Sequence, residues 1–380
     1  MRLLVVDNHA ASPHQQALYR ALAARDGFEV TLLVPRHWHD GFTEQSCHPE
    51  SLPGLRLISA NAAFSGRSHR GFMPHLWTLL RRERFDILLL DAEPETFQAL
   101  HGSLLRSLSA ATSRLVVTSW RNIGQAPGVY PYRLSWLHHY AERNVLSRID
   151  GLIAHNRTAQ SILEKKTRAV IETIPPCVDS ELFKGHPPSE EAVRENGSRF
   201  AIGYAGRLVV EKGVDTLLSA CSRMDHPREL HIYGRGPDEQ RLRKLALTLG
   251  MGDDVIWHGG VALRDLPGHL AALDVLVLPS RTTEFWKEQF GRVLTEAMAA
   301  GVPVVGSDSG EIPETIGPAG LVFPEGDAGS LHDQLLRIRS DRELRRRLIE
   351  AGELRVKEKF SSHVVSGAYA AFFRRISEAK

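Results

Sequence analysis

Two cationic side chains, Arg207 and Lys212, lie in the segment 206–213, which follows an apolar run and precedes a helical pattern. Gly206 lets the backbone approach a ligand closely. A guanidinium offers a planar fork to phosphate oxygens, and an ammonium is a mobile point charge. This arrangement is compatible with phosphate binding, and a solvated loop with ordinary surface charges explains the segment equally well when it is taken alone.

Two carboxylates, Glu288 and Glu296, lie eight residues apart around the start of a later helical pattern. In a continuous helix they would be about 12 Å apart on roughly the same face. We expect Glu288 in the turn before the helix, with Gly291 easing entry into it. Such a pair can hydrogen-bond hydroxyl groups at both ends of an extended ligand, for example a hexose and a ribose. The alternative is an acidic helix start, stabilised by the helix dipole, and one solvent-facing glutamate.

Three more glycine-containing segments, 233–237, 258–261 and 306–313, each follow an apolar run. Backbone amides at such turns suit an anion or sugar hydroxyl groups, and glycines there leave room for a flat ring. Ordinary turns would look the same, and Ser307 or Ser309 would then only cap a helix.

The elements that must position these residues alternate between short apolar runs and helical patterns. Continuous apolarity is typical of parallel strands that are covered on both faces. The expected strands are 2–7, 28–35, 55–59, 86–91, 115–118, 151–154 and 170–174, and then 200–206, 230–234, 255–259, 274–279, 302–306 and 320–323. The expected helices include 15–25, 73–84, 94–109, 131–147 and 157–166, and then 215–222, with Asp215 as N-cap, 238–250, 263–272, 292–300 and 331–339.

This alternation, repeated after a polar stretch at 180–198, predicts two doubly wound α/β sheets. We expect an N-terminal Rossmann-like, acceptor-binding domain at 1–180 and a donor-binding domain at 181–358. An amphipathic C-terminal helix is expected at 359–380. Ligands of open α/β sheets bind at the carboxyl ends of strands, so the motifs are expected to face a cleft between the two sheets.

Composition excludes several classes of protein. Lys and Arg number 47 against 45 Asp and Glu, which gives no general case for a nucleic-acid partner. The three cysteines form no CxxC pair, so neither a disulfide framework nor a structural zinc site is indicated. The sequence shows no signal peptide and no apolar run long enough to span a membrane. We therefore expect a cytoplasmic protein.

Taken in order, these motifs resemble those of the family 4 retaining glycosyltransferases. They are G-R-L-V-V-E-K-G at 206–213, Y-G-R-G-P at 233–237, H-G at 258–259, P-S at 279–280, E-Q-F-G at 288–291 and E-A-M-A at 296–299. The resemblance covers about 200–350 and also I-P-P-C-V-D at 174–179. It implies the GT-B architecture, in which two Rossmann-like domains face each other across a cleft and the C-terminal helix crosses back to the first domain.

The resemblance also assigns roles to particular residues. Arg207 and Lys212 would hold the donor diphosphate, and Glu288 would contact the transferred sugar near the reacting centre. Glu296 would bind the ribose hydroxyl groups. The remaining expected donor-site residues are Gly206, Phe290 and Gly291 near the phosphate or sugar, Arg235 and Val261 near the base, and Ser280 at the end of the neighbouring strand.

The expected reaction needs no cofactor, because the nucleotide-diphosphate sugar, UDP- or GDP-linked, is a substrate. The sequence has no Asp-x-Asp pair for a divalent ion, so Arg207 and Lys212 would neutralise the leaving diphosphate in place of a metal. Retention of anomeric configuration, a glycan, lipid-linked or small-molecule acceptor, and a setting in bacterial surface polysaccharide synthesis are implications of the resemblance. A nucleotide-sugar epimerase and a non-catalytic sugar-nucleotide-binding protein are the alternatives.

The sequence departs from the family pattern in three places. The stretch 8–14 lacks the family's glycine-rich turn, Trp120 stands where many members have a histidine, and 281–286 is an insert before Lys287 and Glu288. Arg121, Asn122 and His14 are candidates to line the acceptor side. Basic residues at 67–84 indicate either an ordinary surface helix or peripheral contact with the inner face of a membrane or with a lipid-linked acceptor.

Overall fold

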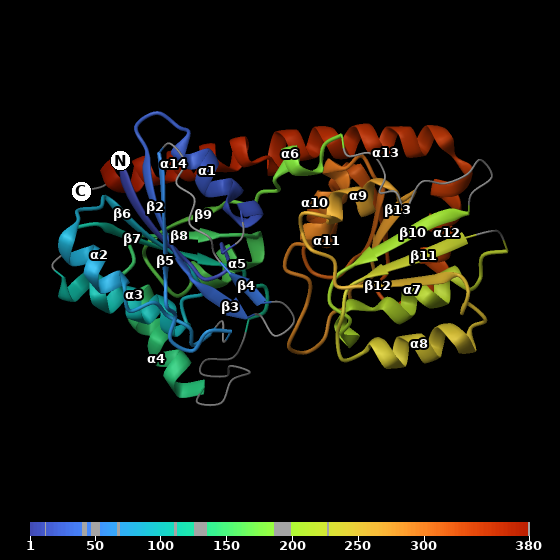
Figure 1. The fold of residues 1–380 in the computed structure, drawn as a ribbon, viewed down its shortest axis with the longest axis horizontal. Helices are drawn as coiled ribbons and strands as arrows, with labels where there is room; N and C mark the ends of the chain where they lie inside the picture. Colours follow the sequence, from blue (N-terminus) through green and yellow to red (C-terminus); the bar gives the residue numbers. More distant parts are fainter. Residues whose placement is uncertain are drawn as a thin grey trace. The chain divides into compact units, whose positions relative to one another are not determined.

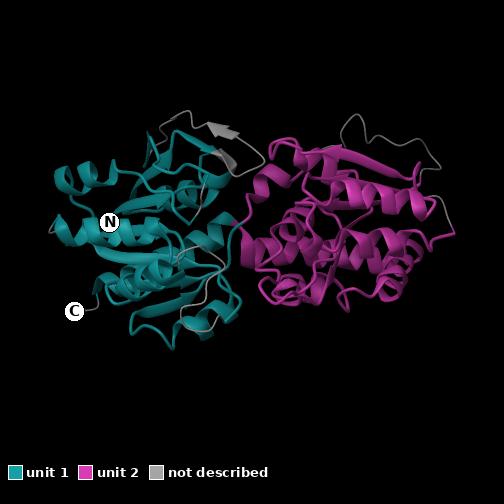
Figure 2. Cartoon of the chain, turned by 90° about the horizontal axis from the view of Figure 1, so that it is seen from below, with its two compact units in different colours: residues 1–177, 362–380 teal, residues 178–361 magenta. Residues whose placement is uncertain are grey.

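The computed structural model describes residues 1–11, 13–39, 44–46, 54–66, 69–109, 112–124, 135–185, 199–225 and 228–378. The chain divides into two compact units, shown in Figure 2. Unit 1 comprises Met1–Cys177 together with Ser362–Lys380, and unit 2 comprises Val178–Ser361. Each unit is an α/β structure built on its own parallel sheet, which confirms the expected pair of Rossmann-like domains.

Unit 1 contains a seven-stranded parallel sheet in the order β5-β2-β1-β6-β7-β8-β9. Its strands are β1 (Arg2–Asp7), β2 (Glu29–Pro35), β5 (Leu55–Ala60), β6 (Ile87–Asp91), β7 (Arg114–Ser119), β8 (Gly151–Ala154) and β9 (Val170–Thr173). Its α-helices are α1 (Ala17–Ala23), α2 (Leu76–Arg82), α3 (Phe97–Leu108), α4 (Ser135–Leu146), α5 (Arg157–Leu163) and α14 (Ser362–Glu378). A short antiparallel hairpin of β3 (His37–His39) and β4 (Glu44–Ser46) was not expected.

Successive residues of the central strands point to opposite faces of this sheet, and both faces are covered. Leu3 and Val5 of β1 pack in one apolar cluster with residues of α1 and α14. Leu4 and Val6 pack in a second cluster, with residues of α2, α4 and α5. Burial on both faces explains why the strands read as unbroken apolar runs. The β1–β6 register sets Asp7 beside Asp91, so both carboxyl groups lie at the same edge.

Helix α14 completes unit 1, although it comes from the far end of the chain. It packs against α1 (Figure 1). Its buried apolar side chains belong to the cluster that covers β1 and β2; they are Val365, Tyr369, Ala370, Phe372, Phe373 and Ile376. The guanidinium of Arg25, just after α1, donates to Ser366 Oγ at 2.9 Å. The first sheet therefore depends on the last helix for one of its two covered faces.

Unit 2 contains a six-stranded parallel sheet in the order β12-β11-β10-β13-β14-β15. Its strands are β10 (Phe200–Ala205), β11 (Arg228–Tyr233), β12 (Val255–Gly259), β13 (Val275–Leu278), β14 (Val304–Ser307) and β15 (Gly320–Phe323). Its α-helices are α6 (Ser180–Phe183), α7 (Val214–Cys221), α8 (Glu239–Thr248), α9 (Leu266–Ala271), α10 (Arg292–Ala299), α11 (Ile312–Ile316), α12 (Ala328–Ser340) and α13 (Arg342–Arg355). Helix α13 was not expected from the sequence.

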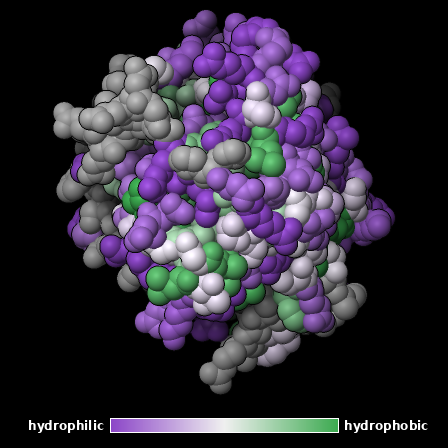
Figure 3. All heavy atoms as spheres, turned by 90° about the vertical axis from the view of Figure 1, so that its right-hand side faces the viewer, coloured by the Kyte–Doolittle hydropathy of each residue, from purple (hydrophilic) through white to green (hydrophobic). Residues whose placement is uncertain are grey.

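None of the described helices is both long and apolar enough to cross a bilayer. On the face drawn in Figure 3, hydrophilic residues predominate and hydrophobic ones form small scattered groups. Scattered apolar side chains of this kind are ordinary on a protein surface.

Candidate functional site

The loops that follow β10 and β13 meet at the point where the strand order of unit 2 reverses. From β10 the chain continues outward to β11 and β12, and then returns to place β13 on the other side of β10. Ligands of open α/β sheets bind at such a switch point. The loop after β10 carries Arg207 and Lys212, and the loop after β13 carries Ser280 and Glu288. The topology thus brings together residues that lie about 80 positions apart in the chain.

The carboxylate of Glu288 is the centre of this site. Lys212 Nζ lies 2.5 Å from Glu288 Oε2, and Ser280 Oγ donates to the same oxygen at 2.7 Å. The side chains of Lys212 and Glu288 are only 14% and 9% exposed. The structure therefore brings three of the predicted site residues, Lys212, Ser280 and Glu288, into one hydrogen-bonded cluster. A mostly buried pair of this kind can exchange partners with a ligand that supplies both an anion and hydroxyl groups.

A tight turn positions Lys212. The chain forms a 3₁₀ turn at Val210–Lys212, and Gly213 follows in the left-handed region with φ of 63°. A Cβ at Gly213 would lie 2.0 Å from the carbonyl oxygen of Pro279, so this loop packs directly on the end of β13. Gly213, in place of the expected Asp215, is the N-cap of α7. The prediction for Asp215 was wrong because the chain turns into the helix two residues earlier, through the left-handed backbone of Gly213.

The backbone around Glu288 is fixed by the loop after β14. The N–H of Glu311 donates to Glu288 O at 3.0 Å, and Ser307 Oγ donates to Ser280 O at 2.5 Å. Glu311 is the N-cap residue of α11, so neither Ser307 nor Ser309 caps that helix. The two serines instead tie the loops together, since Ser309 Oγ lies 3.1 Å from Thr282 Oγ1.

Glu288 precedes α10, as expected, and the glycine before the helix permits the turn. Gly291 is the N-cap of α10 with φ of 82°. Phe290 is buried, and its carbonyl accepts a hydrogen bond from Thr315 Oγ1 at 2.6 Å. Glu296 is buried on α10, and this burial raises the pKa of its carboxyl group, opposed by the charge of Arg292. A buried carboxyl group of this kind is suited to hydrogen bonds with hydroxyl groups.

Arg207 is exposed at the start of the loop after β10. Its carbonyl oxygen accepts a hydrogen bond from Tyr204 Oη at 2.7 Å, which fixes the backbone at that point. The neighbouring Gly206 donates its N–H to Tyr233 O at 2.9 Å. The loop that carries the two predicted phosphate ligands is therefore tied to both β10 and β11.

An aromatic cluster lies on β11, β12 and α9. It contains Tyr233 and His258, which begin two of the glycine-containing segments described above, and two residues that sequence reasoning missed, His231 and His269. The ring of His258 stacks on those of Tyr233 and His231, with centroids 4.3 and 5.3 Å apart. The ring of His269 on α9 lies 5.1 Å from that of Tyr233. Nearby, the exposed Arg235 lies over Gly259, and the partly buried Val261 follows two residues later. Flat rings, a guanidinium and open glycine backbone suit a planar base.

A second polar cluster occupies the carboxyl ends of β6 and β7 in unit 1. Arg121 donates to Glu95 at 2.6 Å and to Glu142 at 2.5 Å, and Lys166 Nζ donates to Glu142 at 2.8 Å. Arg121, a candidate for the acceptor side, is thus engaged in a nearly buried network. Asn122, another candidate, is buried, and the side chain of His14 lies outside the described residues.

Glu93 belongs to this cluster and was also missed. One carboxylate oxygen accepts from the N–H of Trp120 at 2.5 Å, and the other accepts from Ser119 Oγ at 2.6 Å. Burial and the charge of Glu95 raise the pKa of Glu93 to about 7. Trp120, at the place of the family histidine, packs its ring 4.2 Å from that of His155. The acidic residues that directly follow the strand 86–91 were the available sequence signal.

The raised pKa of Glu93 predicts a pH-dependent stability. Because its carboxyl group binds a proton more tightly in the folded chain than in the unfolded one, its contribution to stability is lost as pH rises from 4.5 to about 7. The Glu93→Gln variant has no carboxyl group at this position and should not lose this contribution. Its free energy of unfolding, compared with that of wild type, should therefore be more favourable at pH 8 than at pH 5. Urea denaturation at both pH values measures this difference, with Glu164→Gln as the control. The same pH dependence in wild type and in Glu93→Gln would contradict the prediction.

Comparisons with known proteins find relatives for both halves of the chain. Residues 187–355 match the family model described as "Glycosyl transferases group 1", and residues 12–182 match the one described as "Glycosyltransferase Family 4". Sucrose-phosphate synthase from Thermosynechococcus elongatus has the same fold at a TM-score of 0.73 and 20% identity, with both chains fully covered. Anabaena HepE, solved in complex with UDP, gives 0.71 at 17% identity over 99% of this chain and all of that one.

Relatives of known activity match over shorter stretches. A GDP-mannose-dependent alpha-(1-6)-phosphatidylinositol monomannoside mannosyltransferase of Mycobacterium tuberculosis is 35% identical over 54% of this chain and 56% of that protein. A 2-deoxystreptamine N-acetyl-D-glucosaminyltransferase of Streptomyces fradiae is 29% identical over 74% and 69%. The chain spans about half the length of the first curated relatives it matches.

Two Rossmann-like units of this kind define the GT-B class of proteins. Within that class, the two family matches follow one another along most of the chain. The chain belongs to the family 4 glycosyltransferases, which its motifs resemble.

Proposed function

We propose that the protein transfers a hexose-type sugar from a UDP- or GDP-linked donor to an acceptor hydroxyl group, with retention and without a metal ion. The observation that carries the proposal is the cluster of Lys212, Glu288 and Ser280 at the switch point of unit 2. It combines a cation for the diphosphate with a carboxylate for sugar hydroxyl groups.

In this proposal, unit 2 would bind each group of the donor with a different set of residues. Lys212 and the exposed Arg207 would neutralise charge that develops on the leaving diphosphate. Glu288 would accept hydrogen bonds from the transferred sugar, and Glu296 would bind the ribose. The stacked rings near Arg235 and Val261 would receive the base.

Unit 1 would bind the acceptor at the carboxyl edge of its sheet. The carboxylates of Glu95 and Glu142 are balanced there by the cations Arg121 and Lys166, and Glu93, with a pKa of about 7, adds a partial negative charge. This balance favours an acceptor that presents hydroxyl or ammonium groups over one that presents a phosphate. A glycan or aminocyclitol acceptor, used in bacterial glycoconjugate synthesis, fits this description.

Thermal unfolding in the presence of UDP, GDP, ADP or dTDP, without metal ions, tests the donor site. At a hundred times its dissociation constant, the right nucleotide should stabilise the wild type by about 2.7 kcal/mol. The Arg207→Ala/Lys212→Ala variant should lose this effect, because both cations that face the diphosphate are gone. The Arg243→Ala/Lys244→Ala variant removes one Arg and one Lys from the exposed face of α8 and should respond like wild type.

Stabilisation of the wild type by none of the four nucleotides would overturn the proposal. Equal stabilisation of the Arg207→Ala/Lys212→Ala variant would show instead that the diphosphate binds elsewhere.

A further inference from the structure

Lys212 has a second neighbour that the proposed reaction does not yet use. Its Nζ lies 4.9 Å from the centroid of the Trp286 ring, while it also bonds to Glu288 Oε2 at 2.5 Å. The side chain of Lys212 is only 14% exposed, so little water can reach it. A charged group in that position needs other favourable contacts, and the face of an indole ring supplies one.

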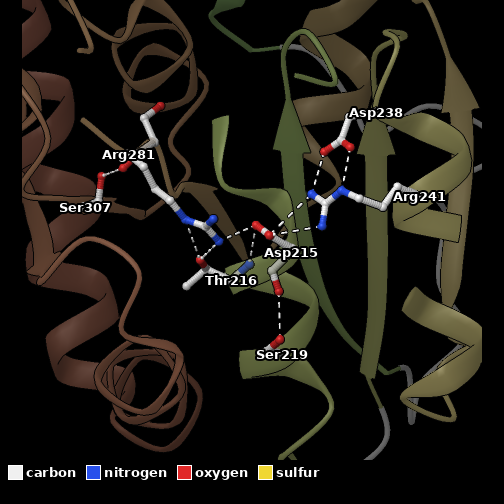
Figure 4. Close-up of polar contacts among 8 residues, drawn as sticks. Asp215, Thr216, Ser219, Asp238, Arg241, Arg281 and Ser307 are labelled. Atoms are coloured by element: carbon white, nitrogen blue, oxygen red, sulfur yellow. Dashed lines mark hydrogen bonds and ion pairs between the residues drawn. The ribbon is translucent and has the colours of Figure 1, made fainter. Parts of the chain in front are cut away.

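Trp286 belongs to the insert 281–286, whose first residue is firmly anchored. Figure 4 shows Arg281 extending to Asp215 and Thr216 at the start of α7. Its guanidinium lies 2.6 Å from Thr216 Oγ1, and its backbone N–H donates to Glu211 O at 2.7 Å. Asp215 is itself held by Arg241 (Figure 4). The insert therefore leaves β13 in a fixed direction.

The far end of the insert is fixed as well. The N–H of Thr283 donates to Trp286 O at 2.7 Å, which closes the insert on itself. Two residues later, Glu288 is held by Lys212 and Ser280. Phe285, by contrast, is 61% exposed, so of the two aromatic residues in the insert Trp286 is the one directed at the site.

Donor binding requires Lys212 to exchange one anion for another. In the structure its ammonium bonds to Glu288, whereas the proposed reaction needs it on the diphosphate and needs Glu288 on the sugar. A ring face attracts the cation through its quadrupole and leaves the three N–H donors free to change acceptors. The same ring can therefore stabilise the ammonium before and after the exchange.

We propose that Trp286 is a positioning residue for donor binding, which holds the Lys212 ammonium beside the diphosphate while Glu288 is released to the sugar. This inference rests on the proposed function. The insert would then contribute to donor binding, and Trp286 would affect the affinity for the donor only through Lys212.

Titration of UDP and GDP into variants tests the inference. Trp286→Leu should weaken binding of the nucleotide that the wild type binds by about tenfold, and Trp286→Phe, which keeps an aromatic face, should restore most of the affinity. Phe285→Leu is the matched control in the same insert and should bind like wild type. Thermal unfolding without nucleotide checks that all four proteins are folded.

A double-mutant cycle separates positioning from a general structural effect. In a Lys212→Ala background, Trp286→Leu should cause no further loss of affinity, because the partner of the ring is absent. An equal loss in both backgrounds, or unchanged affinity in Trp286→Leu alone, overturns the inference. Failure of the wild type to bind either nucleotide overturns the proposed function itself and removes the inference with it.

Discussion

Replacement of Glu288 by glutamine should leave nucleoside diphosphate binding close to that of wild type and lower the rate of sugar transfer by about 100- to 1000-fold. The substitution keeps the shape of the side chain but removes the negative charge and replaces one oxygen with a hydrogen-bond donor. Lys212 and Ser280 both donate to Glu288 Oε2. The glutamine can therefore keep both hydrogen bonds only if its carbonyl oxygen takes that position and its NH₂ group replaces the other oxygen. Initial rates with the donor and acceptor, and nucleotide titration, measure the two effects separately.

Glu284→Gln is the matched control, because Glu284 is an exposed glutamate in the insert that precedes Glu288. It should transfer sugar at the wild-type rate. Transfer at the wild-type rate by Glu288→Gln would remove this residue from the reacting centre, and loss of nucleotide binding would place its main role in holding Lys212.

Replacement of Arg121 by methionine should lower the free energy of unfolding of unit 1 by about 3–5 kcal/mol. Arg121 bonds to both Glu95 and Glu142, and the three side chains are only 4–10% exposed. Without it, Glu95 loses the cation that it is paired with, while Glu142 keeps its ion pair with Lys166. Removing one partner of a buried ion pair leaves an uncompensated charge in a poorly solvated place. Hydrogen exchange of peptides from β6 and β7 measures the loss within unit 1.

Arg106→Met provides the comparison for Arg121→Met. Arg106 also bonds to a carboxylate of unit 1, Asp150, but Arg114 bonds to the same group and would keep it paired. The control should therefore lose much less stability. Similar losses in both variants would mean that methionine packs poorly at either place and that the charge on Glu95 and Glu142 is not the cause.

The strands of both sheets could be predicted from the sequence because burial on both faces leaves an unbroken apolar run. Helix α13 could not be predicted in the same way. Of its residues only Leu348 and Gly352 are buried, so it lacks the apolar stripe that marks a surface helix. The N-cap of α7 was misplaced by two residues, because the sequence does not distinguish the left-handed Gly213 from any other loop glycine.

The sequence predicts that the donor-site motifs lie at strand ends, but it does not predict which of their side chains contact one another. Nothing local in the sequence pairs Lys212 with Glu288, since the topology of six strands brings them together. In unit 1 the family pattern pointed to Trp120 and Arg121, whose side chains already contact His155 and the carboxylates of Glu95 and Glu142. Glu93 and Glu95 were overlooked because acidic residues after a strand look like ordinary turn residues until their common cation is known.

The position of α14 has a consequence for biosynthesis. Unit 1 needs residues from both ends of the chain, whereas unit 2 is one continuous segment, Val178–Ser361. A ribosome that has completed residues 1–177 has made the first sheet without the helix that covers part of it. Unit 2 can fold as soon as it emerges, while the exposed apolar face of unit 1 must wait for Phe372, Phe373 and Ile376. During synthesis, unit 2 should therefore reach its native state before unit 1.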